Sequence, residues 1–337
     1  MEHVAIDLGG SQSQVCVRAA DGAIVEERQC RTTELATVLS KRPPSRVIVE
    51  TCAEAFHVAD ALRASGHDVR VVAATLVRSL GVGARGLKTD RRDAQVLSEV
   101  STRIDLRGVH IPSATSRERK AMCTSREALV SARTQLINCT RGWMRTRGIR
   151  VRSGWTRTFA KRVRATLGTD CPEHIAALLS VVEALDLQIV QLDVALKQLA
   201  NEDPVCRQLM SAPGVGPLTA IRFTASVDQP ERFPNAHRLE SYFGLTPGED
   251  SSGGRQRRTG ISKAGSAPTR RVLVQAALTA KRCARNDPMV RWALEIEKRR
   301  GKQVATVALA RKMAGVLFAM WRDGTLYQSR SAAAVTH

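Results

Sequence analysis

The chain has 337 residues, with 52 Lys and Arg against 32 Asp and Glu, so its formal net charge is +20 at pH 7. A charge of this size favours a polyanionic partner, either nucleic acid or an anionic membrane surface. No uninterrupted apolar stretch is long enough to span a bilayer, and we expect no signal peptide before the first predicted strand. We therefore expect nucleic acid as the partner. The eight cysteines form no C-x-x-C pair and have no histidine at zinc-ligand spacing, so we expect reduced, mostly buried thiols in a cytoplasmic protein.

Residues 1–108 alternate strand-like and helix-like patterns. An Asp-Gly turn at Asp21-Gly22 predicts a hairpin, and Gly66 marks the end of a helix. Strands are expected at 4–8, 14–18, 24–28, 47–50 and 68–73, and helices before the fourth strand, at 53–65 and from Lys88 onward. Three antiparallel strands followed by alternating helices and strands is the element order of the ribonuclease-H-like fold, so we predict an α/β domain of this class.

Four acidic residues of this domain stand at positions suited to metal-dependent chemistry. Asp7 lies in the first predicted strand and Glu50 ends the strand 47–50. Asp90 and Asp93 share one face of the following helix because they are three residues apart. Carboxylates so placed can hold two divalent metal ions, which clamp the attacking and leaving oxygens of a phosphodiester. Each acid alone is more simply a surface residue at the end of an element, but the ordered set of four in a basic protein favours a Mg²⁺ or Mn²⁺ site.

Residues 109–205 are predicted to be helical. From Leu178 to Leu199, apolar residues recur with alternating spacings of four and three, which is the a/d pattern of a coiled coil, either within the chain or between two chains. The residues of this seam are Leu178, Val182, Leu185, Ile189, Leu192, Leu196 and Leu199. A core helix with a narrow apolar stripe is the simpler alternative, and the unbroken register favours the coiled coil.

The stretch between Glu127 and Asp170 contains no acidic residue. Its basic residues are Arg133, Arg141, Arg145, Arg147, Arg150, Arg152, Arg157, Lys161, Arg162 and Arg164, with Trp143 and Trp155 between them. A run of charge is commonly a solvated face. Guanidinium groups, however, match phosphate oxygens and a Trp can stack on a base, so we expect a nucleic-acid surface here.

Residues 206–325 are predicted to form a further, mainly helical unit, with a tail at 326–337. The turn Gly214–Gly216 resembles the hairpin of helix-hairpin-helix modules, although the same pattern occurs in ordinary tight turns. Asn235 is expected to cap a helix that runs to Phe243, and two more helices are expected near 288–300 and 302–321. A polar loop at 248–254 precedes four basic residues that we expect to contact nucleic acid, Arg255, Arg257, Arg258 and Lys263.

In this order, the features resemble the DEDD transposases of bacterial insertion sequences of the IS110 type, over almost the whole chain. The motifs that carry the resemblance are Asp7, "RVIVE" ending at Glu50, "GLKTDRRDAQVLSEV" with Asp90 and Asp93, "APGVGPLTA", "YFGLTPGEDSSGG" and "GISKAGSAPTRRVL". Each motif alone is weak, whereas the ordered combination is specific.

The resemblance implies a ribonuclease-H-like (RuvC-like) N-terminal domain whose four acids bind Mg²⁺ or Mn²⁺, a helical and coiled-coil middle, and a C-terminal transposase domain with a serine nucleophile. By motif position the serine is Ser252, with Ser251 beside it as the alternative. It also implies cutting and rejoining of DNA at element ends and target, a structured guide RNA from the element's flank, and dimers or tetramers in which one subunit's serine meets the other's acids. The chain departs from the usual motif at Thr51-Cys52, beside Glu50.

Three alternatives remain open from the residues themselves. A nuclease of the Holliday-junction-resolvase type shares the fold and the acids but hydrolyses DNA with water. The segment from Asp7 to Ser11 matches the first phosphate loop of sugar kinases and actin-like ATPases, although the late Asp323-Gly324-Thr325 follows a predicted helix rather than a strand. A non-catalytic protein that only binds RNA or DNA is the third.

Overall fold

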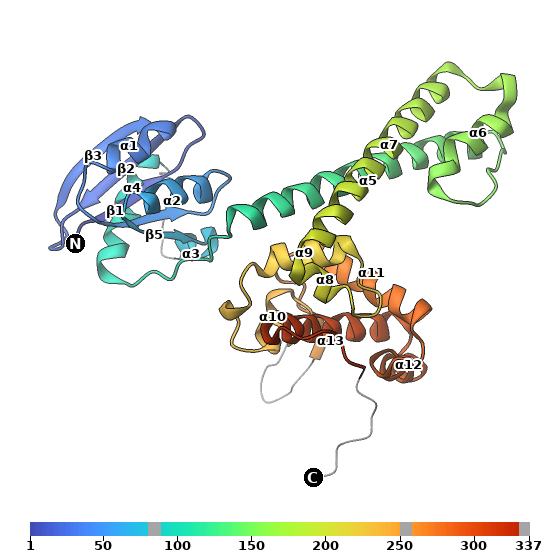
Figure 1. The fold of residues 1–337 in the computed structure, drawn as a ribbon. Helices are drawn as coiled ribbons and strands as arrows, with labels where there is room; N and C mark the ends of the chain where they lie inside the picture. The colour runs from blue at the N-terminus through green and yellow to red at the C-terminus, as the bar shows by residue number, and fades with distance from the viewer. Residues whose placement is uncertain (80–88, 250–257, 330–337) are drawn as a thin grey trace, which may run out of the picture. The chain divides into compact units, whose positions relative to one another are not determined.

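A computed structural model describes residues 1–79, 89–249 and 258–329 of the chain (Figure 1). The chain divides into two compact units, Met1–Pro112 and Ser113–His337. The first is a mixed α/β unit and the second is almost entirely helical. The predicted middle segment and C-terminal unit therefore both lie within the second compact unit.

The N-terminal unit is built on a five-stranded mixed sheet. The strand order is β3-β2-β1-β4-β5, with β1–β2 and β2–β3 antiparallel and β1–β4 and β4–β5 parallel. The bounds are β1 His3–Asp7, β2 Gln12–Arg18, β3 Ile24–Arg31, β4 Arg46–Glu50 and β5 Asp68–Val72. This order is consistent with the predicted ribonuclease-H-like arrangement, and each predicted strand is present within a few residues of its expected bounds.

Helices cover both faces of the sheet because successive strand residues point to opposite faces. Val4 and Ile6 of β1 pack with α1 (Leu35–Leu39) and α2 (Ala55–Ala64). Ala5, between them in sequence, packs on the other face with α3 (Ala74–Ser79) and α4 (Asp90–Arg103). The central strands are therefore buried on both sides, which explains their continuous apolar sequences.

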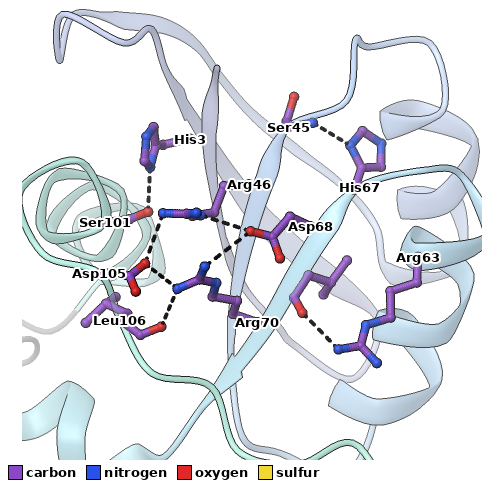
Figure 2. Close-up of polar contacts among 11 residues, drawn as sticks. His3, Ser45, Arg46, Arg63, His67, Asp68, Arg70, Ser101, Asp105 and Leu106 are labelled. Carbon is purple, nitrogen blue, oxygen red and sulfur yellow. Dashed lines mark hydrogen bonds and ion pairs between the residues drawn. The ribbon is translucent and has the colours of Figure 1, made fainter.

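A polar network at the amino end of the parallel strands fixes the direction of α4 (Figure 2). His3 Nδ1 lies 2.8 Å from Ser101 Oγ near the end of α4. Arg46 and Arg70, from β4 and β5, both pair with Asp68 and with Asp105, which follows α4. Because the C-terminal end of α4 is held at the start of β1, the helix runs antiparallel to β1, and its N-terminus points toward the end of that strand.

The second unit begins with a long antiparallel helical hairpin. Its arms are α5 (Ala114–Thr146) and α7 (Glu173–Glu202), and three ion pairs with N···O distances of 2.5 Å join α5 to α7 or to Asp203, the residue that follows α7. The pairs are Arg119–Asp203, Arg126–Asp193 and Arg133–Asp186. The arginines recur every seven residues, as a coiled coil requires.

The predicted apolar seam of α7 faces α5 within the same chain. Val182, Ile189 and Leu196 are buried, and the other four seam residues are half-buried. Of the two arrangements that the heptads allowed, the structure shows the one within the chain. Because α5 already covers the seam, a contact between two subunits would need another face of α7.

A small cap closes the far end of the hairpin. The segment 147–155 links α5 to the short turn Thr156–Thr158 and to α6 (Phe159–Leu167), and another turn, Gly168–Asp170, leads into α7. Phe159 and Val163 of α6 pack against Met144 of α5 and Leu179 of α7. These contacts give the tip its own apolar core.

The C-terminal lobe packs five helices and a two-stranded hairpin around the buried helix α13 (Lys302–Asp323). The surrounding helices are α8 Pro204–Leu209, α9 Pro217–Val227, α10 Ala236–Tyr242, α11 Ala267–Cys283 and α12 Pro288–Arg300, with a short turn at Pro230–Arg232. Asn235 caps α10 through the amide of Arg238, as predicted. Gly214 lies so close to α11 that a Cβ would be 2.3 Å from the Ala276 carbonyl oxygen, so close packing explains this glycine.

Two described helices, α7 and α13, are long and apolar enough to cross a bilayer by length and composition alone, contrary to the expectation from the sequence. In α13 the apolar residues form the core of the lobe, since Leu309, Met313 and Leu317 are fully buried. In α7 one face packs on α5, and another face remains exposed.

Candidate active site

Asp7 and Glu50 lie side by side at one edge of the sheet. Each is the last residue of its strand, and the preceding residues, Ile6 and Val49, are register partners of the parallel pair β1–β4. Both side chains are half-buried. The carboxyl ends of adjacent parallel strands thus bring these two carboxylates to the same edge, as predicted from the sequence.

The other two acids, Asp90 and Asp93, lie in the first turn of α4. Thr89 caps the helix by accepting a hydrogen bond from the amide of Arg92, at 3.3 Å. Asp90 is exposed, whereas Asp93 is only 9% exposed. Because α4 runs antiparallel to β1, its N-terminal end lies toward the end of the strand that bears Asp7.

A neighbouring contact fixes the rotation of α4 about its axis. Arg91 and Gln95 both donate hydrogen bonds to the carboxylate of Glu27 on β3, with a distance of 3.1 Å from Arg91 Nε. The hydrogen bonds from Arg91 and then from Gln95 lower the pKa of Glu27, so its carboxylate is charged at neutral pH. With Arg91 held toward β3, the neighbouring acids are held in one orientation.

The carboxylates of Glu50, Asp90 and Asp93 make no hydrogen bond or ion pair with any other described residue. A buried carboxylate such as that of Asp93 is normally paired, because its desolvation is otherwise uncompensated. Among the described residues, no three His, Cys, Asp or Glu side chains are already grouped closely enough to hold a metal ion. The carboxylates of Glu50, Asp90 and Asp93 thus have unused oxygen ligands, but the described acids do not form a closed ligand set.

The unusual Thr51 has a structural role beside Glu50. Its hydroxyl accepts a hydrogen bond from the amide of Ala74, at 3.2 Å, at the start of α3. Its amide donates to the Val72 carbonyl. Thr51 therefore joins the ends of β4 and β5, and it leaves the position of Glu50 at the strand end unchanged.

The predicted serine loop falls between the two strands of a β-hairpin in the sequence. Strands β6 (Pro247–Glu249) and β7 (Arg258–Ile261) are antiparallel. Ser251, Ser252, Arg255 and Arg257 lie outside the described residues, as does the side chain of Arg258.

Residues 243–246 and 262–265, which flank the hairpin, are joined by backbone hydrogen bonds, and we call this pair of segments the clasp. The amide of Ser262 donates to the Thr246 carbonyl, at 2.8 Å, and that of Lys263 donates to the Gly244 carbonyl, at 3.2 Å. Arg270 of α11 donates from one nitrogen to the carbonyls of Phe243, Ala264 and Gly265. The clasp holds fixed the two chain segments from which the serine loop extends.

The predicted basic surface divides into paired and exposed residues. Acids of α7 neutralise Arg133, through Asp186, and Arg164, through Glu183, although no acid is near them in sequence. Arg157 lies 3.8 Å from Asp193. Arg162 is half-buried and donates to the Trp155 carbonyl. The remaining described residues of the predicted basic surface are exposed, namely Arg141, Arg145, Arg147, Arg150, Arg152 and Lys161 in the stretch and Lys263 in the clasp.

Comparison with known proteins gives two family matches. A model described as "Transposase", for DEDD enzymes of the IS110 type, matches residues 4–146, and one described as "Transposase IS116/IS110/IS902 family" matches residues 206–292. The "Probable family 20 transposase" of Pseudomonas aeruginosa (strain PAO1) is 30% identical over 337 residues, covering 97% of this chain and 99% of that protein. The chain belongs to the IS110 family of transposases.

Two further relatives agree with this assignment. The "Transposase for insertion sequence element IS1111A" of Coxiella burnetii is 27% identical, covering 94% of this chain and 88% of the relative. The "Transposase for insertion sequence element IS1328" of Yersinia enterocolitica is 24% identical, covering 96% and 98%. Transposases of this family cut and rejoin DNA for the transposition of insertion sequences, so this chain is an enzyme that acts on DNA.

Two glycines of the transposase clasp were not predicted to matter. Gly244 and Gly265 have φ values of +66° and +72°, and a Cβ on either would lie 2.1 Å from a backbone carbonyl oxygen, that of Ala264 or of Tyr242. The positions of these glycines within "YFGLTPG" and "ISKAGS" could have indicated turns, but not the close approach of the two segments.

Replacing Gly244 with Ala is expected to destabilise the lobe and to weaken DNA cleavage with it. The left-handed backbone alone costs about 1–2 kcal/mol for a residue with a Cβ, and the contact with the Ala264 carbonyl adds to this. Thermal unfolding and cleavage are the measurements. Gly260→Ala is the matched control, because a Cβ at Gly260 meets nothing within 4 Å. Equal melting temperatures for the two variants would contradict the clasp.

Proposed function

We propose that this transposase cuts and rejoins DNA strands with a metal-dependent DEDD site and a serine nucleophile. The proposal is supported by two observations: Asp7 and Glu50 end adjacent parallel strands, and Glu50 together with Asp90 and Asp93 of the first turn of α4 has no partner among the described residues. The sheet order, with α4 antiparallel to β1, further supports a ribonuclease-H-like domain.

The donor set suits a hard divalent cation. Mg²⁺ prefers carboxylate oxygens and is commonly held by only one or two of them, with the substrate phosphate and water completing its shell. Asp7, Glu50, Asp90 and Asp93 would hold such ions, and a bound metal would neutralise charge on the attacked phosphate. The absence of a closed ligand set is compatible with this chemistry, because the substrate supplies part of the coordination.

The serine has the second role in the proposed reaction. A serine hydroxyl is a weak nucleophile until a base or a metal assists the loss of its proton. In the proposed step, the oxygen of Ser252 bonds to the phosphorus and loses its proton. The bond from phosphorus to the leaving DNA oxygen breaks, and that oxygen is protonated. The phosphoserine link keeps a bond that the rejoining step can exchange, so no ATP is needed.

The basic clusters are proposed to hold the nucleic acids. Arg255, Arg257, Arg258 and Lys263 follow the serine loop in sequence, where a scissile phosphate needs cationic partners. The exposed arginines at the tip of the α5–α7 hairpin suit a second nucleic-acid contact, for which the structured guide RNA of the element is our proposed partner. Because both proposed partners are nucleic acids, we propose that the protein acts in the cytoplasm without contact to a membrane.

The test of the proposed function is a trapping experiment with labelled element-end DNA and Mg²⁺. The proposal expects a protein–DNA species that survives denaturation and whose formation needs the metal. Cleaved DNA without any such species would favour the hydrolytic nuclease instead.

Self-association is proposed to use the exposed side of α7. Ala184, Leu187, Gln191 and Val194 follow one another at spacings of three and four, so they share a face, and all are exposed and uncharged. Leu187 and Val194 are 58% and 61% exposed. A stripe of this kind suits a second copy of α7, packed against this face rather than against the seam that α5 covers.

Replacing both Leu187 and Val194 with Asp is expected to separate dimers or tetramers into smaller species, because the two charges would be buried without partners at the contact. Light scattering coupled to size exclusion measures the result. Val181→Asp is the control. Val181 is also exposed, and it precedes Leu187 by six residues. At 3.6 residues per turn, its side chain therefore points about a third of a turn away from that of Leu187 around the axis of α7. An unchanged mass for the double variant would exclude this face as the contact.

A further inference from the structure

The tip of the α5–α7 hairpin contains a cavity of about 770 Å³. It lies where α5 ends at Thr146 and the chain continues through residues 147–153 toward α6. Arg141, Arg145 and Arg150 contribute to its lining, together with the apolar side chains of Met144, Ile149 and Val151. A cavity of this size with mixed lining is within the range that receives small organic groups.

The cations at this cavity are available to a ligand. Arg141, Arg145 and Arg150 are exposed, and none of them forms an ion pair with a described residue. Arg141 stacks on Phe159, with 5.2 Å from its guanidinium carbon to the ring centroid, which restricts its orientation. The cavity therefore combines apolar groups with three guanidinium groups whose charge the described part of the protein does not balance.

An exposed aromatic side chain lies close by in the chain. Trp155 is 83% exposed and comes two residues after Ser153, which also lines the cavity. Its backbone is nevertheless firmly held, because the Trp155 carbonyl accepts hydrogen bonds from the amide and hydroxyl of Thr158, at 3.1 and 3.0 Å, and from Arg162, at 2.8 Å. An exposed indole on a firmly held backbone is suited to stack on a nucleic-acid base.

We propose that the tip binds an unpaired segment of nucleic acid, with Trp155 stacking on one base and the arginine-lined cavity receiving a neighbouring nucleotide. The proposal deepens the proposed function and rests on it, because it takes the tip arginines to contact nucleic acid. A paired duplex presents only its backbone to such a surface, since its bases are already stacked. Unpaired bases in loops and single strands stack on Trp and Arg instead. Apolar groups in the cavity and the bare indole have no use on a duplex backbone.

The experiment compares binding of the full-length protein to two oligonucleotides of equal length and charge, a hairpin with an unpaired loop and a fully paired duplex, each as RNA and as DNA. Fluorescence anisotropy at several salt concentrations gives the affinities. Intrinsic Trp emission, compared between the wild type and Trp155→Phe, reports stacking on this one residue. The variants are Trp155→Ala, the pair Arg145→Ala with Arg150→Ala, and Trp292→Ala as a matched control from the C-terminal lobe.

The wild type is expected to prefer the hairpin, with quenching of the Trp155 emission. Trp155→Ala should bind the hairpin about 10-fold more weakly, the scale of one stacked base, and the duplex as before. The arginine pair should reduce binding to both and make the salt dependence shallower by about two released counterions. Trp292→Ala should behave as the wild type. Preference for the RNA over the DNA hairpin would identify the guide as the source of the unpaired segment, and the reverse would identify single-stranded DNA.

Equal wild-type affinity for hairpin and duplex, or an unchanged preference in Trp155→Ala, would overturn the inference. Failure of the proposed catalytic function is a separate result. Asp93→Asn and Ser252→Ala test cleavage, and both variants should keep the wild-type preference for the hairpin over the duplex.

Discussion

Replacement of Asp93 with Asn is expected to abolish DNA cleavage while leaving the fold as stable as the wild type, or more stable. Asp93 is only 9% exposed, and its carboxylate has no partner among the described residues. A buried charge without a partner lowers stability, so an isosteric neutral amide removes a cost. Loss of an anionic metal ligand removes several kcal/mol of transition-state stabilisation, which corresponds to about 10³-fold or more in rate.

Asp68→Asn is the matched control for this experiment. Asp68 lies at the opposite end of the sheet, where it pairs with Arg46 and Arg70 (Figure 2). Its replacement should lower the melting temperature slightly, because the pairs are partly exposed, and should leave cleavage intact. Asp93→Asn is thus expected to lose cleavage and keep its stability, whereas Asp68→Asn is expected to keep cleavage and lose some stability.

Metal binding supplies a readout that does not depend on cleavage. A ligand that binds only the folded state raises the free energy of unfolding. Mg²⁺ or Mn²⁺ should therefore raise the melting temperature of the wild type and of Asp68→Asn, and raise that of Asp93→Asn and Glu50→Gln much less. Full cleavage by Asp93→Asn, or equal stabilisation of all four proteins by the metal, would remove Asp93 from the site.

The strand ends of the N-terminal unit were predictable because sequence periodicity and turn chemistry coincide there. Val4 and Ile6 alternate with Ala5, and Asp21-Gly22 occupies a tight hairpin turn in which the Gly22 amide donates to the Ala19 carbonyl. The register of β1 with β4 then brings Asp7 and Glu50 together. The unequal burial of Asp90 and Asp93 was not predictable, because their spacing gives a shared face but not how deeply each lies against the sheet.

Long-range charge pairing is what the sequence could not supply. Arg133 and Arg164 belong to a stretch without acids, yet residues from α7, more than fifteen positions away in sequence, neutralise both. The heptads correctly indicated a coiled coil but not its partner, because an a/d pattern is the same for a partner within the chain and one outside it. The antiparallel pairing of Arg126 with Asp193 and of Arg133 with Asp186 identifies α5 as the partner.

Ser252→Ala is expected to eliminate both strand cleavage and the covalent protein–DNA species. Without the hydroxyl oxygen no phosphoserine bond can form, and the loss should be about 10³-fold or more, as for other nucleophile deletions. Ser252 lies outside the described residues, but the chain on both sides of its loop is held by the clasp between Gly244 and Gly265. The substitution removes one oxygen from a polar loop, so melting temperature and DNA binding should remain those of the wild type.

Ser251→Ala separates the two adjacent serines. Only one hydroxyl can lie in line with the leaving oxygen, so this variant should retain cleavage and the adduct if Ser252 is the nucleophile. The reactions are trapped with labelled element-end DNA, denatured, and digested with protease to locate the modified peptide. The reverse pattern, with the adduct lost only in Ser251→Ala, would move the nucleophile by one residue and leave the chemistry intact. Normal cleavage in both variants, with no adduct in the wild type, would mean that water attacks the phosphate, and the acids of the N-terminal unit would then serve a hydrolytic nuclease.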